Sequence, residues 1–401
     1  MLGELTQVTQ IADKPVFLDD FLRPLWKMLR FSGLYHNFLS SIKENRGFYI
    51  IRSLSTILVI LLVTNFGVFQ LTQLVIRLPN RKSIADISLN MLISVCCLLA
   101  VIFLHQFYTK HNQLVEFFKN WKQAEMQFSD SCNRGRTGRI AKVVKALFFL
   151  ITVSCPFMTL YWNLGSPDES VFFSHLQIFQ DNFSLIFLAF LFSVSMYFTV
   201  MFIVLIEIIP PVIFYLAGCS IENLNQELQN LSTSVHNRHS SDFRNKNLYL
   251  LIWKNYESVR RLVKRANQLF GVMIIANQFC YVFVACSHIY LVIIVYEKDL
   301  SLEIFVINII FTVARTIGSN WLFSHLRTSC CELKSAVADL LSKKWDFLAQ
   351  EQRNILTSFL IRLDKRDAVA RPLNLYDIDP TNLLSLLTVL ISYVIVLLQV
   401  T

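Results

Sequence analysis

Seven long windows nearly free of charged side chains divide this chain of 401 residues. A helix of about twenty residues spans the roughly 30 Å hydrocarbon core of a bilayer, so each window is long enough for one crossing. Charged residues make up 16% of the chain, against about 25% in an ordinary soluble domain. We therefore predict an all-α protein with seven transmembrane helices. The windows cover residues 53–76, 87–109, 146–162, 183–206, 270–296, 304–326 and 381–400, with Glu207 and Arg315 as interruptions.

The basic residues between the windows are distributed unevenly. Lys and Arg number 29 in residues 1–52, 110–139, 218–269 and 328–380, and only 4 in the alternate connections. Because basic loops remain in the cytoplasm, this asymmetry predicts a cytoplasmic N-terminus and, after seven crossings, an extracellular C-terminus. The same loops account for the net charge of +9, so we expect a lipid bilayer and no nucleic acid as partner. A G-protein-coupled receptor would have the opposite orientation.

The windows and their connections suggest four parts of the chain. Residues 1–52 are a cytoplasmic N-terminal segment, and residues 53–327 hold the first six spans with cytoplasmic helical extensions. Residues 328–380 contain cytoplasmic anchor helices, and residues 381–401 form the last span. We expect Pro210 and Pro211 to kink the fourth helix as it leaves the membrane, and Pro372 to end the anchor helices.

Several cytoplasmic stretches carry apolar residues at helical spacing. An apolar face of this size needs a partner surface, because its exposure would favour aggregation. Two interpretations stay open: the stripes pack on each other within one subunit, or they join subunits below the membrane. The stripes are Leu216, Ile221, Leu224, Leu228 and Leu231; Tyr256, Val259, Leu262, Val263 and Ala266; Leu333, Val337, Leu340, Leu341 and Trp345; and Ile355, Leu356, Phe359, Leu360 and Leu363.

Cysteine usage and motif searches give no sign of a metal or a cofactor. The nine cysteines fall in predicted spans or cytoplasmic segments, so no disulfide framework is expected. No Cys or His spacing suggests zinc, and no phosphate-binding loop, His-Glu-x-x-His or nucleophile motif is present, so the chain is not expected to be an enzyme. The external triplet Asn182-Phe183-Ser184 is a candidate N-glycosylation site.

The last window carries the most specific signal. Residues 381–401 contain no charged side chain, and residues 392–400 read Ser-Tyr-Val-Ile-Val-Leu-Leu-Gln-Val. This run resembles the closing signature of insect gustatory receptors, which is Thr-Tyr, five apolar residues, then Gln-Phe. Ser392 and Val400 depart from that pattern. Leu375-Tyr376-Asp377-Ile378-Asp379 also resembles the family's approach to its last helix.

The resemblance implies a tetramer in which each final helix contributes one wall of a central pore. By position, Val396 and Val400 would form the hydrophobic constriction, Gln399 would line the pore with its amide, and Tyr393 would pack lower down. Four apolar side chains can close a pore by excluding water. Val400 is smaller than the family's usual Phe, so this plug is smaller. A lipid-facing position for these residues is the alternative.

A ligand pocket is expected in the outer half of the bundle. Arg315 is the most informative candidate, because a charge within a span is costly unless it is paired or hydrated. Both structural pairing and a place on a ligand or ion pathway stay open for it. His288 can equally be an interhelical hydrogen-bonding group, and Tyr161 and Trp162 can be interfacial aromatic residues. The candidates are Asn90, Tyr161, Trp162, His288, Asn308, Thr312 and Arg315.

The resemblance implies a gustatory receptor subunit: a chemoreceptor in the plasma membrane of a sensory neuron that acts as a ligand-gated, non-selective cation channel. Its partners would be a small-molecule tastant and further gustatory receptor subunits in a homo- or hetero-tetramer. The sugar branch of the family usually has an acidic residue after the last-span Tyr, whereas Val394 stands here, so bitter-type ligands are favoured. The alternatives are an odorant-type subunit that needs a co-receptor, and a secondary transporter, which would show an internal repeat.

Overall fold

The computed structural model describes residues 57–68, 84–128, 182–234, 242–296, 303–364 and 368–378, and isolated positions elsewhere, among them eight between 385 and 399. Within these residues the secondary structure is helical, with short turns between helices. The predicted third span, at 146–162, lies outside the described residues, as do the N-terminal segment, parts of the first span and most of the last span. Side chains at several helix ends also fall outside the described part.

Helices α3 (Ile84–Thr109) and α4 (His111–Phe128) form an angled pair with Lys110 at the corner. The first of them contains the second predicted window and begins three residues before it, so this prediction is confirmed. The Phe103 and Phe107 rings of α3 are tilted to one another with centroids 4.4 Å apart. The Phe103 ring also contacts Phe202 of α7, with centroids 5.6 Å apart. Aromatic residues therefore fix how α3 crosses the centre of the molecule.

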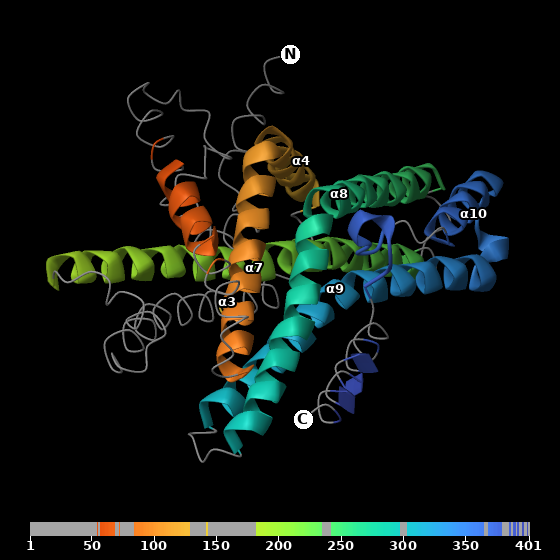
Figure 1. Ribbon diagram of the computed structural model, residues 1–401. Helices are drawn as coiled ribbons and strands as arrows, with labels where there is room; N and C mark the ends of the chain where they lie inside the picture. The colour runs from red at the N-terminus through yellow and green to blue at the C-terminus, as the bar shows by residue number, and fades with distance from the viewer. Residues whose placement is uncertain are drawn as a thin grey trace.

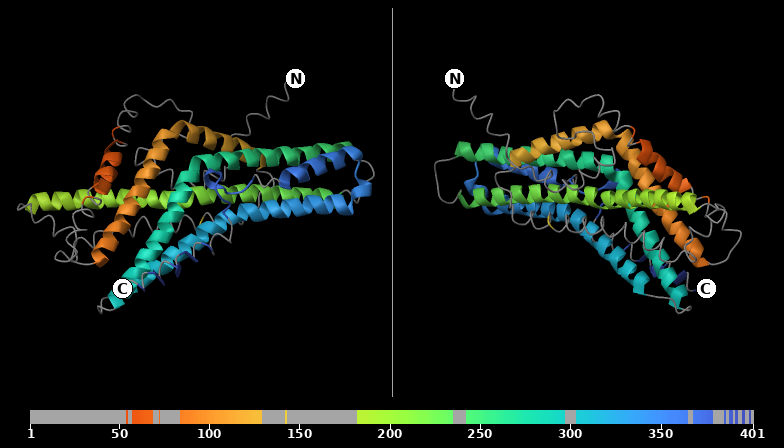
Figure 2. Two further views of the ribbon diagram at one scale, coloured as in Figure 1. Left: turned by 45° about the vertical axis from the view of Figure 1, so that its right-hand side comes forward. Right: turned by 90° about the vertical axis from the view of Figure 1, so that its left-hand side faces the viewer.

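Helix α7 (Asn182–Ser234) runs through the predicted fourth span and on for a further 28 residues without a break. The prediction of a kink at Pro210 and Pro211 is wrong: Figures 1 and 2 show a nearly straight helix. The two prolines remove two backbone donors but leave the helix continuous. Packing explains this, because Val212, Ile213 and Phe214 directly after the prolines are at most 1% exposed and are held on several sides.

The remaining long helices each join a span to its extension. Helix α8 (Asp242–Tyr296) contains an apolar stripe and the fifth span, and α9 (Glu303–Lys343) contains the sixth span and the next stripe. A 3₁₀ turn, η3 (Trp345–Phe347), then leads into α10 (Gln350–Asp364), and a second turn, η4 (Pro372–Asn374), follows. The anchor helices thus end at Asp364, earlier than the predicted stop at Pro372.

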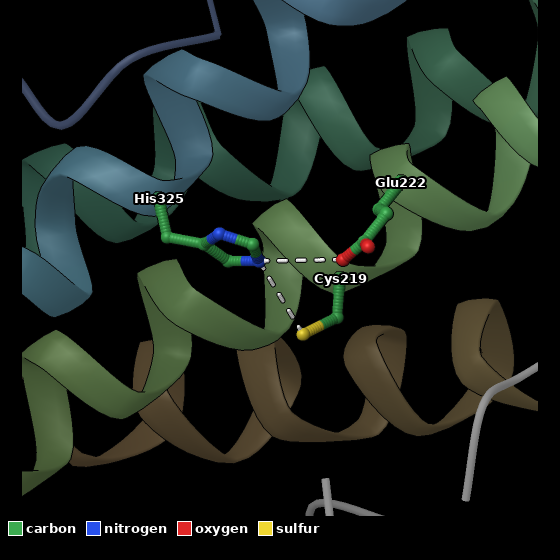
Figure 3. A group of neighbouring side chains, drawn as sticks. All are labelled: Cys219, Glu222 and His325. Carbon is green, nitrogen blue, oxygen red and sulfur yellow. Dashed lines mark hydrogen bonds and ion pairs between the residues drawn. The ribbon is translucent and has the colours of Figure 1, made fainter. Parts of the chain in front are cut away.

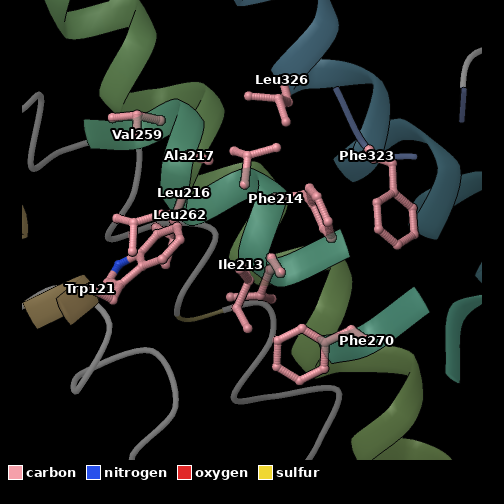
Figure 4. Packing of buried hydrophobic residues seen from close by; sticks show 14 of the residues in the cluster. Trp121, Ile213, Phe214, Leu216, Ala217, Val259, Leu262, Phe270, Phe323 and Leu326 are labelled. Atoms are coloured by element: carbon pink, nitrogen blue, oxygen red, sulfur yellow. The ribbon is translucent and has the colours of Figure 1, made fainter. Parts of the chain in front are cut away.

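The extensions form one bundle, while the other halves of the helices spread apart. In Figure 2, the second half of α7 lies beside the first half of α8, the second half of α9 and α10. Beyond this bundle α3, α8 and α9 slope away from α7, and the end of α8 meets the start of α9. The rings of Trp253 and Tyr256 on α8 pack against Phe359 of α10, with centroid distances of 6.4 and 5.4 Å. Figure 4 shows Phe214 of α7 against Phe323 of α9, whose ring centroids are 5.4 Å apart.

Apart from Trp345, the residues of the apolar stripes are therefore buried or partly buried within one subunit. Leu224, Val263, Val337 and Phe359, one from each predicted stripe, are all at most 1% exposed. The interpretation that the stripes pack on each other is confirmed. A role between subunits would need the outer surface of the same bundle, where Leu251, Trp345 and Ile361 are exposed by 49%, 47% and 58%.

Large apolar side chains also cover the outside of the spreading helices. Leu98, Phe190, Phe279 and Ile310 are more than half exposed, a surface suited to lipid. Among the described residues, Ser193–Ser232 and Asn247–Ser287 are helical, long and apolar enough to cross a membrane, judged by length and composition alone.

Candidate functional site

The two charged residues that interrupt the predicted spans bind each other. Arg315 of α9 forms an ion pair with Glu207 of α7 through its guanidinium group. The Glu207 side chain is 9% exposed and that of Arg315 is 31% exposed. A charge in a membrane span is tolerated when it is paired. Structural pairing is thus confirmed for Arg315, while a role on a ligand or ion pathway stays a prediction.

Further polar groups surround this pair, and we call them, with Glu207 and Arg315, the intramembrane cluster. The Arg315 guanidinium lies over the Tyr281 ring of α8, 5.6 Å from its centroid. On α9, Thr316 donates a hydrogen bond to the Thr312 carbonyl at 2.9 Å, and Asn320 donates to the Thr316 carbonyl at 2.9 Å. The cluster therefore ties α7, α8 and α9 together, and a shift of α9 along α7 would have to break the ion pair.

Of the other predicted ligand residues, the structure describes the side chain of Thr312 alone. Thr312 is buried, at 5% exposure, next to Arg315 in the intramembrane cluster. Asn90, His288 and Asn308 lie on α3, α8 and α9, but their side chains fall outside the described part. The pocket formed by the seven candidates remains a prediction. Tyr161 and Trp162 lie outside the described residues.

Sequence reasoning missed a second site, the connecting segment of residues 368–378, which leads from the anchor bundle toward the last helix. Asn267 of α8 donates to the Val369 carbonyl at 2.8 Å and accepts from the Arg371 backbone N–H at 2.7 Å. Its side chain is buried, so one buried amide satisfies two backbone groups. The sequence signal was a single polar residue, Asn267, directly after the apolar stripe that ends at Ala266.

Close packing against α8 continues one turn further along this helix. A Cβ atom added to Gly271 would lie 2.7 Å from the backbone nitrogen of Leu373, so only glycine allows this approach. Leu373 and Asn374 have positive φ angles of 51° and 61°. Side chains other than glycine adopt that conformation reluctantly, so the tight fit on α8 stabilises a turn that the local sequence disfavours.

The end of the connecting segment is also fixed by polar contacts. The Tyr376 hydroxyl donates to the Gln278 side-chain oxygen of α8 at 2.5 Å, and Arg371 bonds Asp377 at 2.5 Å. Burial raises the pKa of Tyr376, which keeps its phenol protonated as a donor. These contacts hold the chain against α8 directly before the last helix begins.

An ion cluster joins α8 to α10 in the anchor bundle. Glu257 accepts from Arg260 at 2.9 Å and from Arg362 of α10 at 2.8 Å. Partial burial acts to raise the pKa of Glu257, but the hydrogen bonds and charges of Arg362 and Arg260 outweigh it and hold that pKa below its ordinary value. Glu257 therefore remains a carboxylate that binds α10 at neutral pH.

Two of the four pore candidates, Val396 and Gln399, are described, and both are exposed on the last segment. Ser385, Thr388, Ser392, Val396 and Gln399 are all exposed within the isolated subunit, and Val396 is 53% exposed. At 100° per residue they share one face of a helix, within an arc of about 80°. Tyr393 and Val400 lie outside the described residues. Asn182 is the first residue of α7, and its glycosylation stays a prediction.

These observations describe an all-helical membrane protein with a polar cluster inside its bundle and an uncovered polar face on its last segment. A family model described as "7tm Chemosensory receptor" matches residues 22–401. The chain belongs to this family of seven-transmembrane chemosensory receptors, and the resemblance to the gustatory and odorant receptor superfamily is confirmed. The family is in general one of receptors, not of enzymes.

Solved structures give the same result for the fold. The insect olfactory receptor OR5 from Machilis hrabei is similar with a TM-score of 0.68 and 15% identity, over 96% of this chain and 99% of that one. The same receptor in complex with eugenol gives a TM-score of 0.59 and 17% identity, over 96% of this chain and all of that one. No curated protein matched the sequence. The all-α, seven-transmembrane prediction is thus confirmed.

Proposed function

We propose that this chain is a gustatory receptor subunit: a tastant-gated, non-selective cation channel of the plasma membrane of a sensory neuron. Its pore is formed by the last helix of four subunits, with Val396 and Val400 as constriction, Gln399 as lining amide and Tyr393 below them. The N-terminus is cytoplasmic and the C-terminus extracellular. Bitter-type tastants are favoured over sugars, because Val394 follows Tyr393 without an acidic group.

The exposed stripe on the last segment carries this proposal. Ser385, Thr388, Ser392 and Gln399 are exposed in the isolated subunit, although the segment carries no charge and is long enough to cross a bilayer. A side-chain amide that faces hydrocarbon is costly, so Gln399 calls for water or another subunit. A water-filled pore shared by symmetric copies supplies both. The exposed Leu251, Trp345 and Ile361 of the anchor bundle supply a second surface for subunit contacts.

A route from ligand to pore follows from the contacts. A tastant in the outer half of the bundle moves α9 relative to α7 and so acts on the Arg315–Glu207 pair. Helix α8 shares that cluster through Tyr281 and holds the connecting segment through Asn267 and Gln278. Movement of α8 thereby reaches the last helix, which opens the constriction by tilting outward.

The test is ligand-evoked current in cells without G-protein signalling, with a panel of bitter, sugar and odorant compounds. We expect current from the chain, and a higher relative permeability to divalent cations in the Gln399→Glu variant, because four carboxylates would then line the pore. The Phe279→Leu variant, on a lipid-facing position of α8, is the control. Unchanged permeability ratios in Gln399→Glu would contradict a pore at this helix.

An odorant-type subunit that needs a co-receptor is the second candidate, and the likeness to the OR5 fold is compatible with both candidates. It differs from the first candidate in partners and not in fold. Expression of the chain alone separates the two, because a self-sufficient tetramer conducts without a co-receptor. Current that appears only after co-expression of a co-receptor would assign the chain to the odorant type.

The proposed orientation has its own test. An epitope added after Thr401 should bind antibody on intact cells, because seven crossings from a cytoplasmic N-terminus end outside. An epitope before Met1 should need permeabilised cells. Binding at Thr401 only after permeabilisation would contradict the topology.

A further inference from the structure

Three metal-ligating side chains meet where the extensions of α7 and α9 cross. Cys219 and Glu222 are three residues apart on one face of α7, and His325 reaches them from α9 (Figure 3). The Cys219 Sγ atom lies 3.7 Å from His325 Nε2, and Nε2 lies 3.7 Å from Glu222 Oε2. All three ligand atoms lie within 4.8 Å of one another. We call these residues the Cys-Glu-His group.

The spacing of the group is close to that of a tetrahedral zinc site. With Zn–S near 2.3 Å and Zn–N and Zn–O near 2.0–2.2 Å, ligand atoms around one ion are about 3.4–3.6 Å apart. The two separations of 3.7 Å already match this within a few tenths of an ångström. The remaining separation, between Cys219 Sγ and the Glu222 carboxylate, needs a rotation of the Glu222 side chain to reach the same value. Thiolate, imidazole and carboxylate together favour zinc over magnesium or calcium, which prefer oxygen ligands alone.

The surroundings hold the imidazole in place. The His325 ring stacks on Tyr215 with centroids 4.7 Å apart, and Tyr215 stacks on Trp321 at 6.0 Å. A Cβ atom on Gly218 would lie 2.9 Å from the His325 ring and 3.0 Å from the Leu326 backbone, so glycine permits this approach of the two helices. A ligand fixed by its neighbours loses little freedom when a metal binds.

The Cys-Glu-His group is partly exposed, so a metal ion can reach it from solvent. Cys219 is 8% exposed, while the side chains of His325 and Glu222 are 13% and 28% exposed. Three protein ligands leave a fourth position for water, as in zinc sites with an open coordination position. Both helices become polar after this point, with Gln226 on α7 and Glu332 on α9 exposed, so in the proposed topology the group faces the cytoplasm.

We propose that the Cys-Glu-His group is a zinc site that joins α7 to α9. The Cys219 thiol releases its proton as the thiolate binds the ion. Bound zinc then fixes the two helices beyond the Arg315–Glu207 pair and opposes their relative movement. In the proposed channel, whose function this second step presupposes, cytoplasmic zinc lowers the ligand-evoked current.

Cobalt substitution tests the binding step on the purified full-length protein in detergent. We expect one Co²⁺ per chain with the near-ultraviolet absorption of a cobalt–thiolate bond, and loss of these bands on addition of Zn²⁺. Cys219→Ser should abolish the thiolate bands, and His325→Gln and Glu222→Gln should weaken zinc binding at least about ten-fold, because loss of even an outer partner costs about 10–100-fold. The matched controls are Cys331→Ser and Glu332→Gln, which change exposed residues of α9. Both variants should bind zinc as the wild type does.

The outcomes separate clearly. Thiolate bands that survive in Cys219→Ser, or disappear in Cys331→Ser, would overturn the site, and so would an absence of bands in the wild type. Cys219→Ser is nearly isosteric, and its elution from size exclusion and its thermal midpoint without metal show whether it folds. Zinc in the recording pipette should reduce the current of the wild type and not that of Cys219→Ser, and equal inhibition would overturn the effect on gating. Because the cobalt readout needs no current, failure of the zinc site and failure of the proposed channel can be distinguished.

Discussion

Single residues in this bundle are constrained by partners on other helices more than by their neighbours in sequence. Arg315 and Glu207 illustrate this, because each alone would leave an uncompensated charge inside the bundle. Gly271 is the counterpart among small residues, since what matters there is the space that its missing side chain leaves to Leu373. Substitutions at such positions should therefore be read with the partner in view.

The ion pair predicts strong coupling between two mutations. Arg315→Met or Glu207→Leu alone should lower the free energy of unfolding by about 3 kcal/mol, because one buried charge is left unpaired. The double variant should be more stable than the sum of the single effects implies, since no charge then remains. Chemical unfolding of all four proteins in detergent gives the coupling energy. Strictly additive effects would show that the pair contributes no mutual stabilisation.

Two glycines give a matched comparison. Gly271→Ala should lower the free energy of unfolding by about 1–3 kcal/mol, because the new methyl group would lie 2.7 Å from the Leu373 nitrogen. Gly318→Ala on α9 meets nothing within 4 Å and should be neutral or stabilising by up to about 1 kcal/mol through helix propensity. The unfolding assay described for the ion pair measures both. Similar effects at the two sites would contradict tight packing of the connecting segment.

At the scale of elements, the anchor bundle depends on contacts between α8, α10 and the connecting segment. Trp253 and Tyr256 bury the apolar face of α10, and Glu257 adds a charged contact on the neighbouring turn. Asn267 then binds the backbone that follows α10. The two polar contacts fix the position of elements whose apolar faces alone would allow sliding.

Removal of the Asn267 amide should release the connecting segment. Asn267→Leu leaves the Val369 carbonyl and the Arg371 N–H without their hydrogen bonds, and each buried unpaired group costs about 1–3 kcal/mol. We expect faster hydrogen exchange across residues 368–378, measured by mass spectrometry. Gln268→Ala, an exposed neighbour on α8, should leave exchange unchanged. Equal exchange in both variants would show that the amide does not hold the segment.

Acid should weaken the contact between α8 and α10. The folded-state pKa of Glu257 lies below its ordinary value of 4.5, so its contribution is fully present above that value and is lost as the pH falls through the lowered pKa. Hydrogen exchange in α10, corrected for intrinsic rates, should rise in this acidic range in the wild type. Glu257→Gln should show raised exchange at pH 7 and little further change on acidification. Asp339→Asn, in an exposed pair with Lys343, is the control and should behave as the wild type.

The sequence predicted elements well and contacts poorly. The windows at 87–109, 183–206, 270–296 and 304–326 fall within α3, α7, α8 and α9, because a bilayer demands long apolar helices whatever they contact. The pairing of Arg315 with Glu207 depended on how two helices cross, which periodicity along one helix does not contain. Cys219 and His325 meet for the same reason, so their separation along the chain did not indicate a zinc site. The straight course of α7 past Pro210 was likewise decided by its neighbours.

At the scale of the whole molecule, the fold leaves two surfaces exposed in the isolated chain. One is the outer side of the anchor bundle, with Trp345 and Ile361, and the other is the polar stripe of the last segment. They lie at different parts of the chain, and the proposed tetramer offers each of them a contact with a neighbouring subunit. The proposed pore would therefore exist in the assembled tetramer and not in a single subunit.

A polar substitution within the stripe should open the proposed gate without ligand. In Val396→Thr, four hydroxyl groups replace four methyl groups at the constriction, so water enters and the ligand-independent current rises. Ile391 is the matched control: it is also exposed, at 56% against 53% for Val396, but it lies about 140° away around the helix, outside the stripe. Ile391→Thr should keep the low resting current of the wild type, measured at equal surface expression. A resting current that rises equally in both variants would show that helix stability, and not the hydration of a pore-facing gate, is what the substitutions change.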